Sequence, residues 1–314
     1  MLYHTTTYKA GVSEDRIAVI DYSCKKQRRV TQMTEKRKFY GMRNDYMFHA
    51  VLQKNEEVLR NLLATLLEMD EADIVSCHIE NPIELGKEIE GKECILDVKL
   101  TLNHAKIINI ELQVYKQTYW VERSLLYWAR AYDNLKSGED YSKLLPTYHI
   151  GIMDFTLFEE CPKFMAQYQI MDVEDQFLYS DKLCIKVLDL TQLDAVRKQA
   201  NINKKLVKWA SIFKAETLEE LEQLANGEEV FEKMVVTMKK LSEDEKIRMQ
   251  CEAREDYERC LLSEFNAGKR EGRAAGRSEG RTEGRTEALT ELIHNLMETQ
   301  HISEEEAKKM LKIQ

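Results

Sequence analysis

Two short stretches of alternating sequence decide the fold: ILDVKLTL at residues 95–102 and INIELQV at residues 108–114. In both stretches every even-numbered position is apolar, and the odd-numbered positions from residue 97 onward are polar. Alternation with a period of two is typical of half-buried strands that have one polar face. The sequence therefore predicts strands over residues 93–102 and 106–115.

The same alternation limits how these two strands pair. If they form a hairpin with both apolar sets on one face, the numbers of opposed residues add to an even sum. A three-residue loop at 103–105 gives a sum of 208 and places Asp97 opposite Glu111. A five-residue loop would instead place Asp97 opposite Gln113, and Lys99 opposite Glu111. In either register these four side chains share one face.

The first register brings two carboxylates together, with Cβ atoms about 4.5–5.5 Å apart. Directly opposed like charges are destabilising, and a hard divalent cation such as Mg²⁺, or Mn²⁺ in its place, would neutralise them. A water on such a cation can be activated to attack a phosphate. The hairpin thus predicts a metal site made by Asp97 and Glu111. The competing interpretation is an amphipathic hairpin whose polar face only meets solvent.

Residues 119–136 are predicted to form a helix with two opposite stripes. The stripe suited to packing on the sheet consists of Val121, Leu125, Trp128 and Tyr132. The opposite stripe consists of Arg123, Tyr127, Arg130 and Asn134. Arginines beside an aromatic ring can grip backbone phosphates and stack on a base, which makes Arg123, Tyr127 and Arg130 candidate DNA contacts. Alternatively, this face is solvated or Arg123 pairs with an acid.

Other elements complete an α/β pattern. Residues 44–69 have apolar side chains at helical spacing and predict one long helix capped by Asn44 or Asp45. Further strand candidates lie at 147–155, 167–171 and 183–188. From residue 193 the chain is predicted to be helical, with capping boxes beginning at Thr217 and Ser242. This order indicates an α/β core followed by a helical addition.

Composition narrows the class of protein. The seven cysteines form no CxxC pair, which argues against a disulfide framework and a cysteine zinc site and favours the cytoplasm. No apolar run is long enough to cross a membrane, and the first residues lack the layout of a signal peptide. The net charge of −9 disfavours nucleic acid as a partner, although a nuclease needs only a local basic track.

The two ends of the chain differ from the middle. Residues 1–38 carry nine Lys or Arg against four acids. They predict either a basic arm for nucleic acid or a disordered or untranslated extension, with Met33 as the first residue of the protein.

Near the other end, glycines recur every four residues, with arginines stacked at the same interval. The glycines are Gly268, Gly272, Gly276, Gly280 and Gly284. Because glycine weakens a helix and like charges four residues apart repel, this segment is predicted to be a frayed linker. The amphipathic piece after it could pack on itself, so an oligomerisation helix is the alternative.

Five motifs occur in a recognisable order: NDYxF at 44–48, ILDV at 95–98, NIELQ at 109–113, RSLxYW at 123–128 and IxDF at 152–155. Together they resemble the recombination-promoting nuclease and transposase family of the PD-(D/E)XK superfamily. The resemblance implies a restriction-endonuclease-like core with a mixed sheet flanked by helices. It also implies a metal-dependent DNA endonuclease linked to recombination or transposition, with Asp97 and Glu111 as the Mg²⁺ ligands.

One position departs from that superfamily. Gln113 stands where a lysine is usual, and glutamine brings no charge; Lys99 or Lys116 could substitute. A catalytically inactive DNA-binding protein or an assembly protein of the same fold therefore stays open, as does RNA in place of DNA. The expected divisions are an N-terminal extension at 1–38, the nuclease core at 39–190, a helical region at 191–266 and a tail at 267–314.

Overall fold

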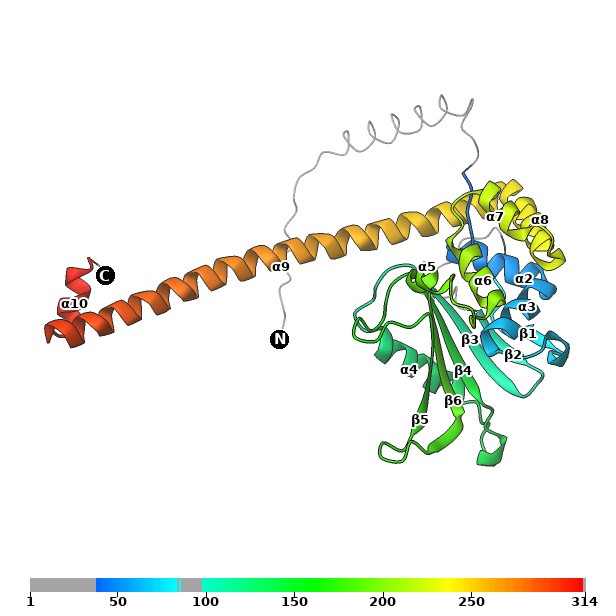
Figure 1. The fold of residues 1–314 in the computed structure, drawn as a ribbon, viewed down its shortest axis with the longest axis horizontal. Coiled ribbons are helices and arrows are strands. Elements are labelled where there is room, and N and C mark those ends of the chain that lie inside the picture. Colours follow the sequence, from blue (N-terminus) through cyan, green and yellow to red (C-terminus); the bar gives the residue numbers. More distant parts are fainter. Residues whose placement is uncertain (1–37, 84, 86–97, 313–314) are drawn as a thin grey trace, which may run out of the picture.

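The computed structural model describes residues 38–83, 85 and 98–312. In this part of the chain a six-stranded sheet has the order β1-β2-β3-β4-β6-β5, with helices packed on both faces (Figure 1). The strands are β1 (Cys77–Ile79), β2 (Val98–Leu102), β3 (Lys106–Gln113), β4 (Thr147–Met153), β5 (Met165–Met171) and β6 (Leu178–Asp189). β3, β4 and β6 run parallel, and the other neighbours are antiparallel. The predicted α/β class with a mixed sheet is confirmed.

The hairpin of β2 and β3 has the tighter of the two predicted registers. Leu102 pairs with Lys106, and Lys99 pairs with Asn109, so opposed residue numbers add to 208. The five-residue loop, which would have placed Lys99 opposite Glu111, is therefore wrong. Asn103 closes the turn with a positive φ, and its side chain bonds the backbone of residues 73, 75 and 76.

The two faces of the sheet are covered by different helices. The even-numbered residues of β2 and β3 enter the main core with α2 (Asp45–Lys54), α3 (Glu56–Leu67) and α6 (Lys204–Lys214). The other face carries α4 (Trp120–Tyr132) over a smaller apolar cluster. Because side chains alternate along a strand, the odd-numbered residues of β3 point toward α4. This places Glu111 and Gln113 on the α4 face.

The long helix predicted over residues 44–69 is divided in two. Asn44 caps α2, as predicted, by accepting a hydrogen bond from the Met47 N–H. Asn55 has extended backbone angles and accepts from the Val58 N–H, which starts α3. An asparagine side chain competes with the backbone for such bonds. The apolar spacing continues across this break, so periodicity alone did not reveal it.

Helices follow the sheet, as predicted. They are α5 (Leu193–Val196), α6, α7 (Leu218–Ala225), α8 (Glu229–Glu243), α9 (Glu245–Gln300) and α10 (Glu304–Met310). Thr217 caps α7 as expected. The box at Ser242 is wrong, because Ser242 lies inside α8 and Asp244 caps the next helix. Short 3-10 turns span Glu71–Asp73, Tyr141–Lys143 and Leu190–Gln192. No described helix is long and apolar enough to span a membrane.

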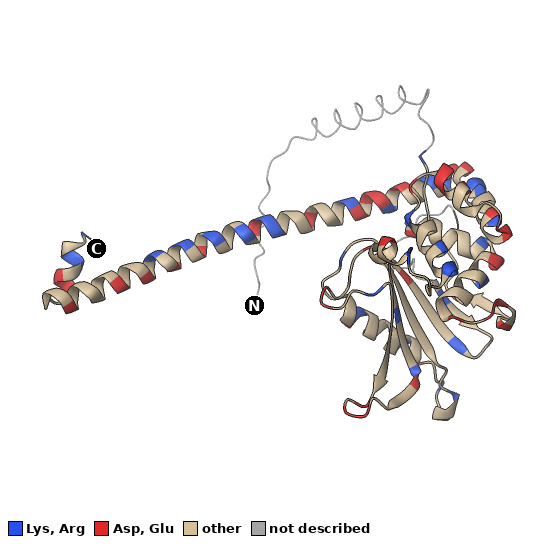
Figure 2. Cartoon of the chain, viewed as in Figure 1, with Lys and Arg blue, Asp and Glu red and all other residues tan. Residues whose placement is uncertain are grey.

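The glycine repeat is part of α9 rather than a frayed linker, which corrects the prediction. The helix is anchored at its start, where Ile247 and Cys251 are buried. Once a helix is nucleated, each further residue adds one backbone hydrogen bond. The threonines of the repeat also bond back to carbonyls four residues earlier. Figure 2 shows blue and red residues interspersed along the helix, so neither charge forms an unbroken block.

One glycine sets the distance between α4 and the sheet. A Cβ added to Gly151 of β4 would lie 2.6 Å from the Trp120 ring and 2.8 Å from the Met153 methyl. Gly151 is also the β4 residue paired with Glu111 of β3. The absence of a side chain here lets the start of α4 approach the strand pair.

We expect Gly151→Ala to destabilise the fold by about 1–3 kcal/mol, because overpacking displaces the buried Trp120 ring. The matched control is Gly276→Ala in α9, where an added Cβ meets nothing within 4 Å. That change should leave the core intact and favour the helix by about 1 kcal/mol. Urea unfolding of both variants measures the difference. Equal unfolding midpoints would contradict the close packing of α4.

Candidate functional site

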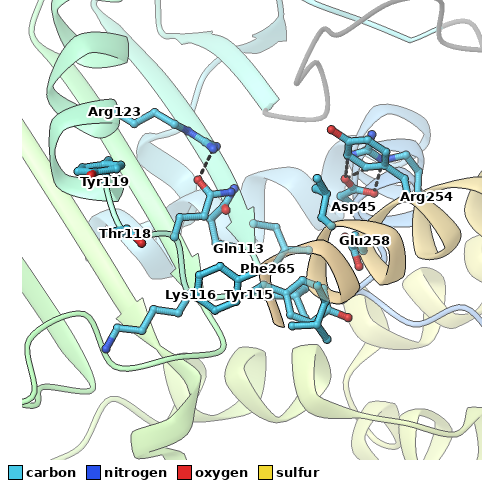
Figure 3. Close-up of a pocket in the computed structure, with 16 residues that line it drawn as sticks. Asp45, Gln113, Tyr115, Lys116, Thr118, Tyr119, Arg123, Arg254, Glu258 and Phe265 are labelled. Carbon is cyan, nitrogen blue, oxygen red and sulfur yellow. Dashed lines mark hydrogen bonds and ion pairs between the residues drawn. The ribbon is translucent and has the colours of Figure 1, made fainter. Parts of the chain in front are cut away.

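A pocket of about 650 Å³ opens between the carboxyl end of β3 and the first turns of α9 (Figure 3). Residues 112–119 and Arg123 of α4 form one side. Asp45 of α2 and residues of α9 form the other side. The β3 residues singled out from the sequence therefore lie at one end of a pocket, and the first helix of the fold lies at its other end.

Glu111 is the most deeply buried charge of the α4 face. It belongs to β3, pairs with Gly151 of β4, and has 0% of its surface exposed. Removing a carboxylate from water is costly unless other groups replace its hydration. The sequence-based alternative of a polar face that simply meets solvent does not apply to this residue.

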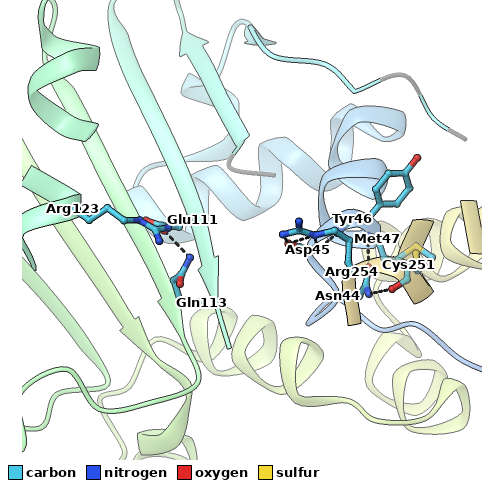
Figure 4. Close-up of polar contacts among 9 residues, drawn as sticks. All are labelled: Asn44, Asp45, Tyr46, Met47, Glu111, Gln113, Arg123, Cys251 and Arg254. Atoms are coloured by element: carbon cyan, nitrogen blue, oxygen red, sulfur yellow. Dashed lines mark hydrogen bonds and ion pairs between the residues drawn. The ribbon is translucent and has the colours of Figure 1, made fainter. Parts of the chain in front are cut away.

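Three side chains satisfy the Glu111 carboxylate, and Figure 4 shows two of them, Arg123 and Gln113. Arg123 of α4 forms an ion pair with Oε1. Gln113 Nε2 donates to the same oxygen at 2.6 Å. His149 Nε2 lies 3.2 Å from Oε2. Arg123 thus pairs with an acid, which was one of the alternatives left open by the sequence, and Gln113 lies beside Glu111 on the face predicted for it.

His149 was not among the residues selected from the sequence. Asn109, which pairs with it across β3 and β4, places Nδ2 3.2 Å from His149 Nδ1. Because that amide nitrogen is a donor, Nδ1 accepts and the ring proton sits on Nε2, directed at Glu111. The rings of Trp120 and Tyr127 surround the imidazole. The available signal in the sequence was that Asn109 and His149 are polar residues within two predicted strands that are rich in isoleucine.

The two lysines considered as substitutes for the usual lysine each pair with another acid and not with Glu111. The Lys99 ammonium pairs with Glu80 at 2.9 Å, and the Lys116 ammonium pairs with Glu159 at 3.0 Å. Asp97 lies outside the described residues.

Two further candidates belong to α4. Tyr127 lies beside Arg123, whose guanidinium carbon is 5.3 Å from the ring centre. Arg130 is exposed on the same helix.

The predicted phase of α4 needs correction. Leu125, assigned to the stripe on the sheet, is 46% exposed, whereas Trp120 and Ser124 are buried. Val121 and Trp128 do pack against the smaller apolar cluster. The α4 helix is rotated so that Arg123 faces the sheet and reaches Glu111. The buried Glu111 carboxylate requires a cation, and the long Arg123 side chain can supply one.

A second arginine–carboxylate pair joins the first helix to α9. Asp45, in the first turn of α2, is held by two nitrogens of Arg254 (Figure 4). The preceding residue, Asn44, donates to the Cys251 carbonyl at 3.0 Å. Arg43 pairs with Asp154, which follows β4. The motif residues at 44–45 and 154 therefore fasten the helices to the end of the sheet.

Glu258, one turn after Arg254, borders the same pair. Burial and, to a lesser degree, the nearby charge of Asp45 raise the pKa of the Glu258 carboxyl to about 7, against the lowering influence of Arg254. At neutral pH this side chain is therefore present in both the acid and the carboxylate form. It can donate or accept a hydrogen bond inside the pocket.

The comparisons with known proteins agree with this geometry. A family model described as PD-(D/E)XK nuclease family transposase matches residues 42–265, more than half of the chain. The chain belongs to this family. Neither a curated protein nor a solved structure matches it. The match confirms the resemblance drawn from the five motifs, and it runs past residue 190 into α9, stopping before the glycine repeat.

Members of the PD-(D/E)XK family are expected to hold a divalent metal ion, which needs several oxygen or nitrogen ligands close together. Within residues 38–83, 85 and 98–312, no three His, Cys, Asp or Glu side chains group closely enough to hold an ion. Here Glu111 has an imidazole and a guanidinium beside it, and Arg123 supplies the positive charge. A hard cation fits this place only with a further oxygen ligand. Asp97, the residue before β2, is the candidate.

Arg123→Ala should destabilise the protein by about 3–5 kcal/mol, because it leaves a fully buried carboxylate without its cation. The control is Arg130→Ala on the same helix, which should change the free energy of unfolding by no more than about 0.5 kcal/mol. Urea denaturation of both variants measures the two values. An Arg123 variant as stable as the Arg130 variant would mean that Glu111 does not depend on this ion pair.

The raised pKa of Glu258 predicts that this side chain lowers the free energy of unfolding in a pH-dependent way. The Glu258 carboxyl holds its proton more tightly in the folded state than in the unfolded state. The free energy of unfolding therefore falls as the pH rises from the unfolded pKa of about 4.5 through the folded pKa of about 7. Glu258→Gln removes this loss, so the variant should gain stability over wild type across that window and keep the gain above it. Unfolding measured from pH 4 to 8 gives the difference. A difference independent of pH would contradict the raised pKa.

Proposed function

We propose that the chain is a divalent-metal-dependent DNA endonuclease that hydrolyses phosphodiester bonds in recombination or transposition. The observation that carries the proposal is Glu111, a fully buried carboxylate whose partners Gln113 and Arg123 line the pocket. Structural ion pairs are common, but this one lies on the strand that the family's motifs single out. Arginine and lysine side chains border the pocket, as phosphate binding requires.

In this proposal Asp97 and Glu111 hold Mg²⁺, with Mn²⁺ as a substitute. When bound, the cation supplies Lewis-acid stabilisation of the charge that develops on the phosphate. Gln113 lacks the charge of the usual lysine but orients Glu111 through its amide. His149 fixes the second carboxylate oxygen from the opposite side.

Arg123 is proposed to supply the positive charge that Gln113 does not bring. Its guanidinium has five donors in a planar fork, which suits a carboxylate or a phosphate. The same side chain can therefore neutralise Glu111 in the free protein and contact a DNA phosphate. Tyr127 and Arg130 extend this contact along α4, and Lys99 joins it only by leaving Glu80.

The second candidate is a protein of the same fold that binds DNA or assembles without cleaving. The neutral Gln113 motivates it. The exposed end of α9 from residue 267 onward, together with α10, also offers a surface for contact with a second copy, which we propose as the basis of a homo-oligomer. We further propose the cytoplasm as the compartment, because DNA is the partner and the described cysteines are all free thiols.

The test is nicking of supercoiled plasmid by the purified full chain with Mg²⁺, Mn²⁺ or EDTA. Asp97→Asn and Glu111→Gln should each lower the cleavage rate by at least about 100-fold, since both remove a charged ligand while keeping side-chain shape. Glu160→Gln, an exposed carboxylate beyond the pocket, should cleave like wild type.

Cleavage in EDTA, or by Glu111→Gln at the wild-type rate, would refute the metal assignment. If no form of the protein cleaves under any condition, binding measured at two salt concentrations separates the remaining candidates. Affinity for DNA that falls steeply with salt indicates a DNA-binding protein, and no affinity indicates an assembly protein.

A further inference from the structure

Aromatic and aliphatic side chains line much of the pocket beside Glu111 without being buried in the core. Four are contributed by the α9 wall and two by the loop after β3. They are Tyr115, Tyr119, Tyr257, Leu261, Leu262 and Phe265, and each has at least 37% of its surface exposed. Apolar side chains scattered singly on a surface need no explanation, but a set gathered around one concavity marks a binding site.

Polar groups occupy defined places in the same pocket. Figure 3 shows Arg123 and Gln113 on one side and Asp45, Arg254 and Glu258 on the other. Arg254 also lies 5.3 Å from the Tyr257 ring, so it presents a flat cation next to an aromatic face. Glu258 offers a donor and an acceptor at neutral pH because its carboxyl titrates near 7. The pocket thus combines stacking surfaces with hydrogen-bonding groups on two sides.

These features define the ligand by its chemistry. Flat aromatic walls suit a planar ring, and the Arg254 and Glu258 groups suit the edge of a ring that carries both donors and acceptors. The cations Arg123 and Lys116 on the opposite side suit a phosphate attached to that ring. A nucleotide has all three parts. The cavity volume of about 650 Å³ lies within the range of sites for small ligands.

A base within a duplex cannot use such a site. Its two faces are covered by neighbouring bases, and it reaches a pocket only after leaving the stack. Single strands, frayed ends and mismatched positions release a base at least cost.

We infer that this pocket binds one unstacked nucleobase of the DNA substrate, and that the substrate is therefore single-stranded or locally unpaired DNA. The inference rests on the proposed function, because it names the form of DNA that the site accepts. It assigns Tyr257 and Phe265 of α9 as stacking residues and Arg254 with Glu258 as contacts to the base edge. The phosphate of that nucleotide then lies beside Arg123, which pairs with Glu111.

The test measures binding in EDTA, so that it does not depend on cleavage. The probes are a fluorescein-labelled single strand of mixed sequence, its blunt duplex, and a strand of equal length built from abasic units. The full chain should bind the single strand at least about tenfold more tightly than the duplex or the abasic strand. Such a factor corresponds to about 1.4 kcal/mol, within the range for stacking one base on an aromatic ring.

Two pairs of matched variants locate the effect. Tyr257→Ala and Phe265→Ala should each weaken binding of the single strand about tenfold and leave binding of the abasic strand unchanged. Tyr179→Ala and Phe177→Ala alter rings that are also exposed, and that lie outside the pocket. They should bind like wild type. Because all four side chains are exposed, loss of the fold is not expected, and circular dichroism verifies this.

Each other outcome overturns the inference. Equal binding of normal and abasic strands would mean that only phosphates are recognised. If Tyr257→Ala and Phe265→Ala changed the sedimentation behaviour instead of the binding of DNA, the pocket would be covered by a second copy of the chain. The plasmid assay is read separately. Base-dependent binding without cleavage would refute the nuclease alone, and cleavage without base dependence would refute the nucleobase pocket alone.

Discussion

The arrangement around β3 depends on keeping one negative charge away from water. Glu111 has no exposed surface, so its carboxylate must receive a cation and hydrogen bonds from the protein. Arg123 meets the first requirement, and Gln113 and His149 meet the second. This demand fixes the rotation of α4 and thereby the position of Trp120 over Gly151. The local structure of β3, β4 and α4 therefore depends on how the Glu111 carboxylate is satisfied.

Two arginine–carboxylate pairs flank the pocket in the same manner. Arg123 pairs with Glu111 on the sheet side, and Arg254 pairs with Asp45 on the helical side. In both pairs the arginine belongs to a helix, Arg123 to α4 and Arg254 to α9, and the ion pair joins that helix to a neighbouring element. The pocket is therefore bordered by cations that are already paired. A phosphate or a metal entering this space exchanges partners with existing ion pairs rather than meeting free charges.

The sequence predicted the structure best where one local constraint, the alternation of apolar and polar residues, decided it. Strict alternation in β2 and β3 limited the hairpin to registers that bury both apolar sets, and of the two that were predicted the structure has the one with the shorter loop. The division at Asn55 was not predictable from periodicity, since the apolar spacing continues through it. The phase of α4 was wrong at Leu125, which is apolar but exposed, because the pairing of Arg123 with an acid was only one of the alternatives and did not identify Glu111 as the partner. His149 was missed because its role depends on a neighbouring strand.

The continuous course of α9 has a mechanical consequence. From Gly276 to Gln300 the helix extends about 36 Å at 1.5 Å per residue. A bend of about ten degrees near Gly276 would displace its far end by about 6 Å, while leaving the anchored turns at Ile247 and Cys251 in place. The glycines of the repeat lie within the continuous helix α9, and glycine restricts the backbone less than any other residue. A bend near Gly276 would therefore move α10 far more than the turns of α9 that line the pocket.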